Sequence, residues 1–217
     1  MKNKFVIFWD WNGTIVDDAF LFVKIMNSFL REKKLPLIDI KQYKSFFGFP
    51  LIQYYKKLGF DFREEPFVDL GFRFIERYKQ FRFEAKLFPE IKNLLGWLSN
   101  KNCSQFVVSA QEHSLLLSAV DYYNLSNFFI DCRGVDNLLA LKKIEIAKSL
   151  KEKFIHAGDR VFVVGDTLHD FEVAKALGAV PVLVSYGHCC SARLNRCGLP
   201  VVASVGDLKK FFVKSLR

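Results

Sequence analysis

The chain has 217 residues, of which 51% are hydrophobic and 25% are charged, and its formal net charge is +9 at pH 7. This length suits one domain, or a domain with an inserted subdomain, and the composition excludes intrinsic disorder. The apolar runs are much shorter than the roughly 20 residues that a membrane helix needs, and no secretory signal opens the chain. Five cysteines, an odd number, describe no disulfide framework. We therefore expect a cytoplasmic protein with no membrane contact.

The excess of 32 Lys and Arg residues over 23 Asp and Glu residues can attract phosphorylated ligands or nucleic acid. The lysines lie in scattered pairs, such as Lys33–Lys34 and Lys209–Lys210, rather than in one block. Scattered pairs are typical of solvated helix faces. We therefore do not expect nucleic acid as a partner, and the sequence says nothing about oligomeric state.

The first predicted element is a strand at Lys4–Trp9, whose continuous apolar run is typical of a strand buried on both faces. It runs directly into Asp10-Trp11-Asn12-Gly13-Thr14. The carboxyl ends of parallel strands form the ligand crevice of an open sheet, so Asp10 is predicted to point into a site. A carboxylate there can be a metal ligand, a nucleophile or a helix cap.

Residues 17–82 have a different pattern. Asp17 and Asp18 suit a helix N-terminus, and apolar residues follow at helical spacing. A second helical stripe runs from Phe67 to Tyr78, and only Phe60–Phe62 is ambiguous between strand and loop. The region is predicted to be an all-helical subdomain inserted after the first strand.

Strand and helix patterns alternate after residue 82. Strands are predicted at Gln105–Ser109, Asn127–Asp131 (a weak signal), Val161–Val164 and Val180–Val184. Helices are predicted at Glu90–Asn100, Glu112–Tyr122, Lys143–Lys153, Leu168–Leu177 and Val205–Val213. This alternation predicts an α/β fold with a mainly parallel sheet. The predicted core comprises residues 1–16 and 83–217.

A second acidic cluster follows the strand at Val161–Val164. Gly165 permits a tight turn, and Asp166 and Asp170 are four residues apart, on one side of a helix start. Convergent carboxylates without thiolate or imidazole partners suit a hard cation such as Mg²⁺. The alternative is a helix cap with a solvated aspartate.

Ser109 ends a predicted strand, and Lys143 opens a predicted helix. A hydroxyl with the following backbone N–H can hold a phosphoryl oxygen, and a lysine can neutralise developing charge. Either residue alone would indicate little, because serines at strand ends and lysines at helix starts are common.

Taken together and in this order, the motifs resemble those of the haloacid dehalogenase (HAD) superfamily, over essentially the whole chain. The first motif, Asp-x-Asp-Gly-Thr, is matched by Asp10-Trp11-Asn12-Gly13-Thr14 with one departure, Asn12. Ser109 matches the second motif, and Lys143 matches the third, with Lys142 as the alternative. The fourth, Gly-Asp-x-x-x-Asp, is matched in full by Gly165, Asp166 and Asp170. The chain looks most like the phosphoglycolate-phosphatase-like members.

The resemblance implies a Rossmann-like core with a helical cap, and a Mg²⁺-dependent phosphatase acting on a small phosphorylated substrate. Asp10 would be the nucleophile that forms an aspartyl-phosphate. Ser109, Ala110, Lys143 and Trp11 would bind the phosphoryl group. The metal ligands implied are Asp10, the backbone carbonyl of Asn12, Asp166 and Asp170.

The resemblance also implies an aspartate at position 12 as the acid–base residue, and Asn12 cannot shuttle a proton at neutral pH. Three explanations are open: a leaving group that needs no protonation, as in acyl phosphates; another acid, either His169, which is nearest in the sequence, or a residue of the helical cap; or a loss of efficient phosphatase chemistry. The alternative functions are cleavage of a carbon–halogen or carbon–phosphorus bond and a weakly active phosphate-binding protein. His188-Cys189-Cys190 with Cys197 lacks a zinc-site spacing and is predicted to be an ordinary loop.

Overall fold

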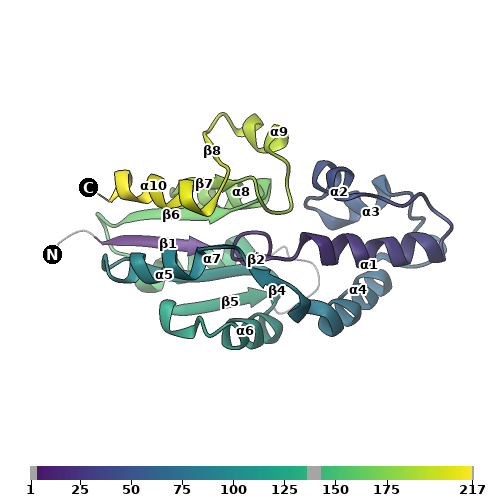
Figure 1. The fold of residues 1–217 in the computed structure, drawn as a ribbon, viewed down its shortest axis with the longest axis horizontal. Helices are drawn as coiled ribbons and strands as arrows, with labels where there is room; N and C mark the ends of the chain where they lie inside the picture. The colour runs from purple at the N-terminus through teal and green to yellow at the C-terminus, as the bar shows by residue number, and fades with distance from the viewer. Residues whose placement is uncertain (1–3, 136–142, 217) are drawn as a thin grey trace.

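The computed structural model describes residues 4–135 and 143–216. The described part of the chain is centred on a six-stranded parallel sheet in the order β5-β4-β1-β6-β7-β8 (Figure 1). The strands are β1 (Phe5–Trp9), β4 (Ser104–Glu112), β5 (Asp131–Val135), β6 (Arg160–Gly165), β7 (Val180–Val184) and β8 (Val201–Val202). The predicted α/β class with a Rossmann-like parallel sheet is confirmed.

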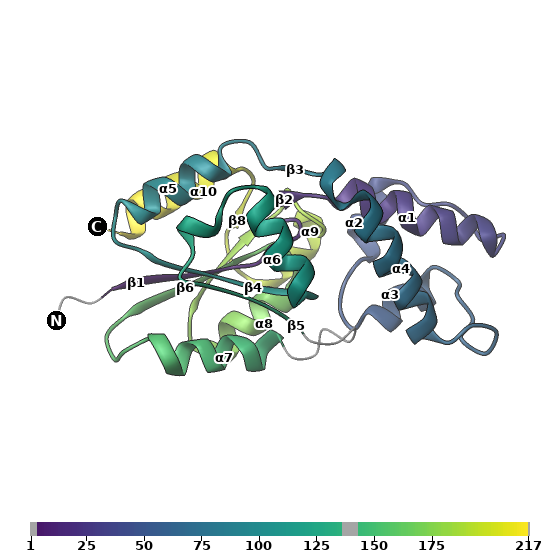
Figure 2. The ribbon, with the colours of Figure 1, turned by 90° about the horizontal axis from the view of Figure 1, so that it is seen from below.

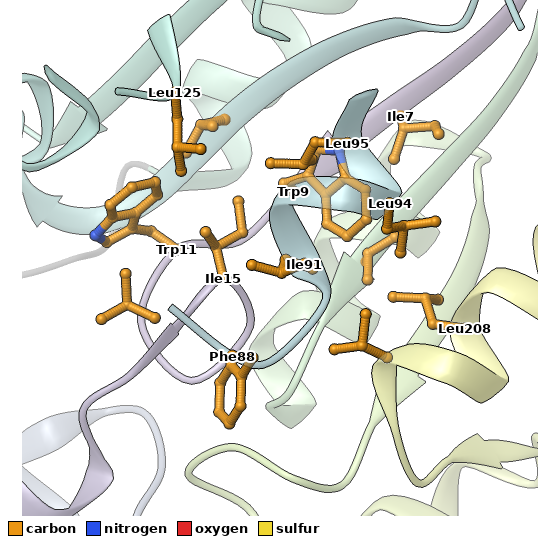
Figure 3. Packing of buried hydrophobic residues seen from close by; sticks show 14 of the residues in the cluster. Ile7, Trp9, Trp11, Ile15, Phe88, Ile91, Leu94, Leu95, Leu125 and Leu208 are labelled. Atoms are coloured by element: carbon orange, nitrogen blue, oxygen red, sulfur yellow. The ribbon is translucent and has the colours of Figure 1, made fainter. Parts of the chain in front are cut away.

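Helices cover both faces of the sheet, which explains why its central strands are continuously apolar. On one face lie α5 (Ile91–Ser99), α6 (His113–Tyr122) and α10 (Val205–Ser215), and on the other lie α7 (Lys143–Phe154) and α8 (Leu168–Leu177) (Figure 2). Alternate residues of β1 face opposite helix layers. Ile7 and Trp9 belong to the hydrophobic cluster that includes α5, α6 and α10, whereas Val6 and Phe8 belong to the cluster that includes α7 and α8. Figure 3 shows Trp9 packed near Leu94 and Leu95 of α5.

The insert has four helices in the described structure: α1 (Ala19–Glu32), α2 (Ile40–Phe46), α3 (Leu51–Lys57) and α4 (Phe67–Phe81). They enclose a hydrophobic cluster of their own, which includes Ile25, Phe29, Tyr43 and Leu70. We call residues 19–81 the helical insert. A short antiparallel pair, β2 (Val16–Asp17) with β3 (Lys86–Leu87), brackets it. The domain boundaries at 16/17 and 82/83 stay a prediction. Strand β2 contains the first boundary, and β3 begins after the second.

Two predicted elements differ in the structure. The predicted strand Asn127–Asp131 is wrong, because Ser126–Phe128 forms a 3₁₀ turn and β5 begins only at Asp131. Phe128 and Phe129 instead pack against the core cluster, so their apolar character reflects burial rather than strand pairing. Phe60–Phe62 forms no strand, and Phe60 is buried against Tyr55. The chain also forms 3₁₀ turns at Arg82–Glu84 and Asn195–Cys197 and a short helix α9 (Ser191–Leu194).

The topology places the site. Strand β1 is central, with β4 on one side and β6 on the other, and the chain reaches these neighbours by separate crossovers. A ligand crevice forms where neighbouring parallel strands diverge in this way. The helical insert lies beyond the carboxyl ends of these strands, and the start of β1 and the end of α10 lie at the opposite end of the molecule (Figure 1). Among the described residues, no helix is long and apolar enough to cross a membrane.

Candidate active site

Three carboxylates converge at the carboxyl ends of β1 and β6. Asp10 directly follows β1, Asp166 directly follows β6, and Asp170 lies in the first turn of α8. Each offers an oxygen within 4.8 Å of the others, and all three are buried. An all-oxygen, trianionic set of this kind fits a hard divalent cation.

Lys143 reaches the same point from the start of α7. Its side chain is buried, and its ammonium group pairs with Oδ1 of Asp10 and, at 2.6 Å, with Oδ1 of Asp170. The structure thus places Lys143 beside the predicted nucleophile, and the alternative Lys142 lies outside the described residues. Burial of a charged lysine without partners would be very costly, so these two ion pairs hold it in the site.

Neighbouring polar groups orient the carboxylates. The Thr14 hydroxyl donates to Asp166 at 3.2 Å and to Asp10 at 3.4 Å, and the backbone N–H of His188 donates to Asp166. Thr167 donates to Oδ2 of Asp170 through its backbone N–H at 3.0 Å and through its hydroxyl at 2.7 Å. Asp170 therefore caps α8 with one oxygen while the other faces Lys143, so the helix-cap role considered from the sequence applies to it, and its role as a metal ligand stays a prediction.

Glycine is required at two positions beside these carboxylates. Gly13 has φ of +73°, and a Cβ there would collide with the side chains of Asp166 and His188. A Cβ at Gly165 would collide with the Asp170 carboxylate. The Gly of each acidic motif therefore makes room for a carboxylate of the site.

Burial, together with crowded negative charge, shifts the pKa values of the carboxyl groups. Burial raises the pKa of Asp10 to about 6 although Lys143 opposes the rise, and burial raises the pKa of Asp166 to about 7, with Asp10 and Asp170 adding repulsion. Burial also acts on Asp170, but Lys143 and Thr167 outweigh it and lower the pKa of that carboxyl. The site is thus short of positive charge, which a bound divalent cation would supply.

The remaining predicted phosphate-binding residues lie at the end of β4 and beside Asp10. Ser109 is buried, and Ser109 and Ala110 line a cavity together with Asp10 and Lys143. The pairing of β4 with β5 is irregular between Val108 and Glu112, which separates the Ser109 region from the regular ladder. The Trp11 indole is buried in the core cluster, as Figure 3 shows, and Trp11 is not among the described residues that line the cavity.

Asn12 belongs to a buried polar network that joins the core to the helical insert. Its amide Nδ2 donates to Oδ2 of Asp18 at 2.6 Å and to the Tyr78 hydroxyl at 2.8 Å, and that hydroxyl donates to Asp18 at 2.9 Å. His188 Nε2 lies 3.0 Å from Oδ1 of Asp18, and His188 Nδ1 lies 2.6 Å from the Tyr43 hydroxyl. Burial disfavours a charged His188, but the nearby carboxylates, Asp18 first, outweigh it and raise the pKa of His188.

Sequence reasoning missed four members of this network: Asp18, Tyr43, Tyr78 and His188. Asp18 is the N-terminal flanking residue of α1 but makes no capping hydrogen bond, and its carboxylate is fully buried. Its signal in the sequence, an acidic residue before a helix, is the ordinary signal of a cap. In the described structure Cys189, Cys190 and Cys197 form no disulfide, and they do not gather with His188 into a group of three candidate metal ligands.

His169 is the nearest candidate for a substitute acid in the sequence. Its ring lies 5.0 Å from that of Phe49, and its Nδ1 lies 3.1 Å from the Glu172 carboxylate. It does not line the cavity that contains Asp10, whereas His188 does.

The raised carboxyl pKa values predict a pH-dependent stability. Because Asp10 and Asp166 hold protons to higher pH in the folded state than in the unfolded chain, metal-free protein should lose stability as the pH rises from about 4 to about 7. Asp166→Asn removes one of the two groups. Chemical denaturation should therefore show a smaller decrease in the free energy of unfolding between about pH 4 and about pH 7. At pH 8 the variant should be more stable than the wild type by on the order of 1 kcal/mol.

Asp121→Asn is the matched control, because Asp121 is exposed on α6 and lies outside the site. Its pH profile should follow that of the wild type. An Asp166→Asn profile as steep as the wild-type profile would contradict the assignment of the raised pKa to this carboxyl.

The comparisons with known proteins agree with this geometry. The profile of the haloacid dehalogenase-like hydrolase family matches residues 6–184. Among curated proteins, a phosphoglycolate phosphatase of Chromobacterium violaceum is 23% identical over 97% of this chain and 98% of its own length. A phosphoglycolate phosphatase of Aquifex aeolicus is 27% identical over 84% of this chain and 85% of its own length.

Solved structures share the fold at low identity. A haloacid dehalogenase-like family hydrolase from Streptococcus pneumoniae superposes with a TM-score of 0.80 at 21% identity, covering 97% of this chain and 100% of that one. A protein from Clostridium acetobutylicum described as a predicted phosphatase superposes with a TM-score of 0.82 at 21% identity, covering 98% and 100%. The order of the motifs, their convergence around Asp10 and the match over most of the chain lead to one conclusion: this protein belongs to the haloacid dehalogenase-like hydrolase family.

Proposed function

We propose that the protein is a cytoplasmic, Mg²⁺-dependent phosphatase that hydrolyses a small phosphorylated metabolite through an aspartyl-phosphate on Asp10. The observation that carries the proposal is the convergence of Asp10, Asp166 and Asp170 with Lys143, beside a cavity that Asp10, Lys143 and Ser109 line. The names of the curated relatives, phosphoglycolate phosphatases, support phosphate-ester chemistry.

The donor set fits magnesium. Asp10, Asp166 and Asp170 offer carboxylate oxygens, the backbone carbonyl of Asn12 lies in the same loop as Asp10, and Mg²⁺ prefers such oxygen ligands. When bound, the ion would supply positive charge to the phosphoryl oxygens. The raised pKa values of Asp10 and Asp166 are a second argument, since a cation would stabilise the ionised carboxylates against the burial, and the smaller mutual repulsion, that raise these values.

The chain's own residues account for the remaining work. Lys143 and Thr14 fix the Asp10 carboxylate, so one oxygen can attack phosphorus without losing rotational freedom at that moment. In this proposal the Ser109 hydroxyl, the Ala110 backbone N–H and the Lys143 ammonium hold phosphoryl oxygens, which is supported by the place of all three residues in the cavity lining. The helical insert contributes about half of the residues that line the cavity.

The proposal predicts metal-dependent turnover. Phosphomonoesters, acyl phosphates and haloacids should be assayed with Mg²⁺ and after exhaustive chelation. We expect release of inorganic phosphate only with Mg²⁺, no halide release, and a melting temperature that rises with Mg²⁺ concentration, because a ligand that binds only the folded state stabilises it.

A chelated enzyme with undiminished turnover would contradict the proposed metal dependence. Halide release without phosphate release would favour carbon–halogen cleavage instead. Asp121→Asn serves again as a control, and its Mg²⁺ response should equal that of the wild type.

A further inference from the structure

The wall of the cavity opposite Asp10 is strongly apolar. The cavity has a volume of about 530 Å³ and extends from Asp10 and Ser109 to the helical insert. The insert contributes mainly aromatic and aliphatic side chains to it, including Phe22, Phe47, Phe49, Leu51, Phe74 and Ile75. Aromatic rings favour edge-to-face or offset contacts with another ring and offer little to an anionic group. The part of the substrate beyond the phosphoryl group therefore meets an apolar surface.

The cations of the cavity are already engaged. Among the lining residues that the structure describes, Lys143 pairs with Asp10 and Asp170, and His188 faces Asp18. Lys79 pairs with Glu76 at 2.8 Å, and Glu112 also lines the cavity. A carboxylate on the organic part of the substrate would find no unengaged positive partner among these residues. The lining therefore disfavours a second anionic group, such as the carboxylate of a glycolate ester.

The reactive end of the cavity offers poor proton donors for a leaving group. Asn12 carries an amide, which is not an acid at neutral pH, and its Nδ2 is committed to Asp18 and Tyr78. Both ring nitrogens of His188 are engaged, one by Asp18 and one by Tyr43. A leaving oxygen that is stable as an anion suits this arrangement. A phenol, with a pKa of about 10 as in tyrosine, meets that condition far better than an alkyl alcohol, whose pKa lies near the value of about 15.7 for water.

These two features converge on one substrate class, and the inference rests on the function proposed above. We infer that the protein hydrolyses phosphate monoesters of small apolar phenols, that is, aryl phosphates. An Asp10 oxygen attacks phosphorus, the bond between phosphorus and the aryl oxygen breaks, and the aryl oxide leaves with the electron pair and takes a proton from solvent. Water then hydrolyses the aspartyl-phosphate, which releases inorganic phosphate and restores the carboxylate. Acyl phosphates also leave unaided, but the aromatic wall favours a ring.

Three substrates separate the effect of the apolar wall from the effect of the missing proton donor. Phenyl phosphate has a ring and a phenol leaving group, benzyl phosphate has the ring but an alcohol leaving group, and phosphoglycolate has an alcohol leaving group and a carboxylate. The quantity to compare is kcat/KM at saturating Mg²⁺, because it reports the phosphoryl transfer to Asp10 and not the later hydrolysis. We expect phenyl phosphate to exceed benzyl phosphate by at least tenfold, and phosphoglycolate to be the poorest of the three.

A matched pair of variants tests the wall itself. Ile75 lines the cavity from α4, whereas Val68 lies on the same helix, 46% exposed and away from the cavity. Ile75→Lys should lower kcat/KM for phenyl phosphate at least tenfold, chiefly through KM, and raise kcat/KM for phosphoglycolate. Val68→Lys should change neither value. Circular dichroism and thermal melts of both variants establish that they fold.

The possible failures are distinguishable. If phosphoglycolate is the best of the three substrates, or if benzyl phosphate equals phenyl phosphate, the aryl assignment is overturned while the phosphatase proposal stands. Beryllofluoride, a phosphoryl mimic without a leaving group, tests that proposal separately. If ¹⁹F NMR shows no Mg²⁺-dependent adduct and none of the esters is hydrolysed, the proposed function itself is wrong.

Discussion

Asp10→Asn should reduce turnover of every phosphate ester by several orders of magnitude while leaving the fold intact. The amide keeps the shape of the side chain but lacks the negative charge that attacks phosphorus, and loss of a covalent nucleophile is among the largest single effects in enzymes. The fold should survive because Lys143 keeps its ion pair with Asp170, at 2.6 Å, and because the substitution removes a carboxylate whose charge burial disfavours. Steady-state kinetics and a thermal melt measure the two expectations.

The beryllofluoride adduct gives a second readout for the same variant. Its ¹⁹F signal should be present in the wild type and in Asp121→Asn, and missing in Asp10→Asn. Turnover of purified Asp10→Asn within tenfold of the wild type would show that another group is the nucleophile.

Exchanging the amide and the carboxylate between positions 12 and 18 should create an acid–base catalyst. In the structure, Asn12 Nδ2 donates to Asp18 Oδ2 at 2.6 Å. In the double variant Asn12→Asp/Asp18→Asn the same hydrogen bond runs in the opposite direction. The Tyr78 hydroxyl, which lies 2.8 and 2.9 Å from these two groups, can then accept from the new amide at position 18 and donate to the new carboxylate at position 12. The carboxyl group introduced at position 12 can protonate an alcohol leaving group.

The expected gain depends on the leaving group. For benzyl phosphate, kcat/KM of the double variant should rise at least tenfold, which corresponds to about 1.4 kcal/mol of barrier and lies within the roughly 10²–10⁴-fold that acid–base catalysis typically supplies. For phenyl phosphate the change should be small, because that leaving group departs unaided. The phenyl-over-benzyl preference of the wild type should therefore shrink.

The single variant Asn12→Asp is the informative control. It places two carboxyl groups next to each other where the wild type has a 2.6 Å hydrogen bond, so the two groups must share a proton. Because that proton is lost at higher pH, the melting temperature should fall as the pH rises. The double variant should be free of this penalty. If the double variant is stable and binds beryllofluoride but shows no gain with benzyl phosphate, Asn12 is not the residue that limits protonation.

The sheet, the helical insert and the residues around Asp10 could all be predicted from the amino-acid sequence. Strands buried on both faces are continuously apolar, so the segments near β1, β6 and β7 stand out in the sequence alone. The acidic motifs are equally visible because each follows such a strand, and a parallel sheet brings the carboxyl ends of its strands to one edge. The position of β5 could not be read in the same way, because Phe128 and Phe129 are apolar for packing and not for pairing.

The surroundings of Asn12 and the lining of the cavity, in contrast, follow from tertiary packing alone. Asp18, Tyr78 and His188 lie far apart in the sequence, and each has an ordinary local explanation, as a helix start, a helix stripe and a loop residue. They become one hydrogen-bonded network only because the insert folds back over the loop after β7. The apolar wall has the same origin, since Phe47 and Ile75 look like core residues in the sequence. Whether such a side chain faces the core or a cavity depends on how the helices pack against each other. The local periodicity of the sequence is the same in both cases.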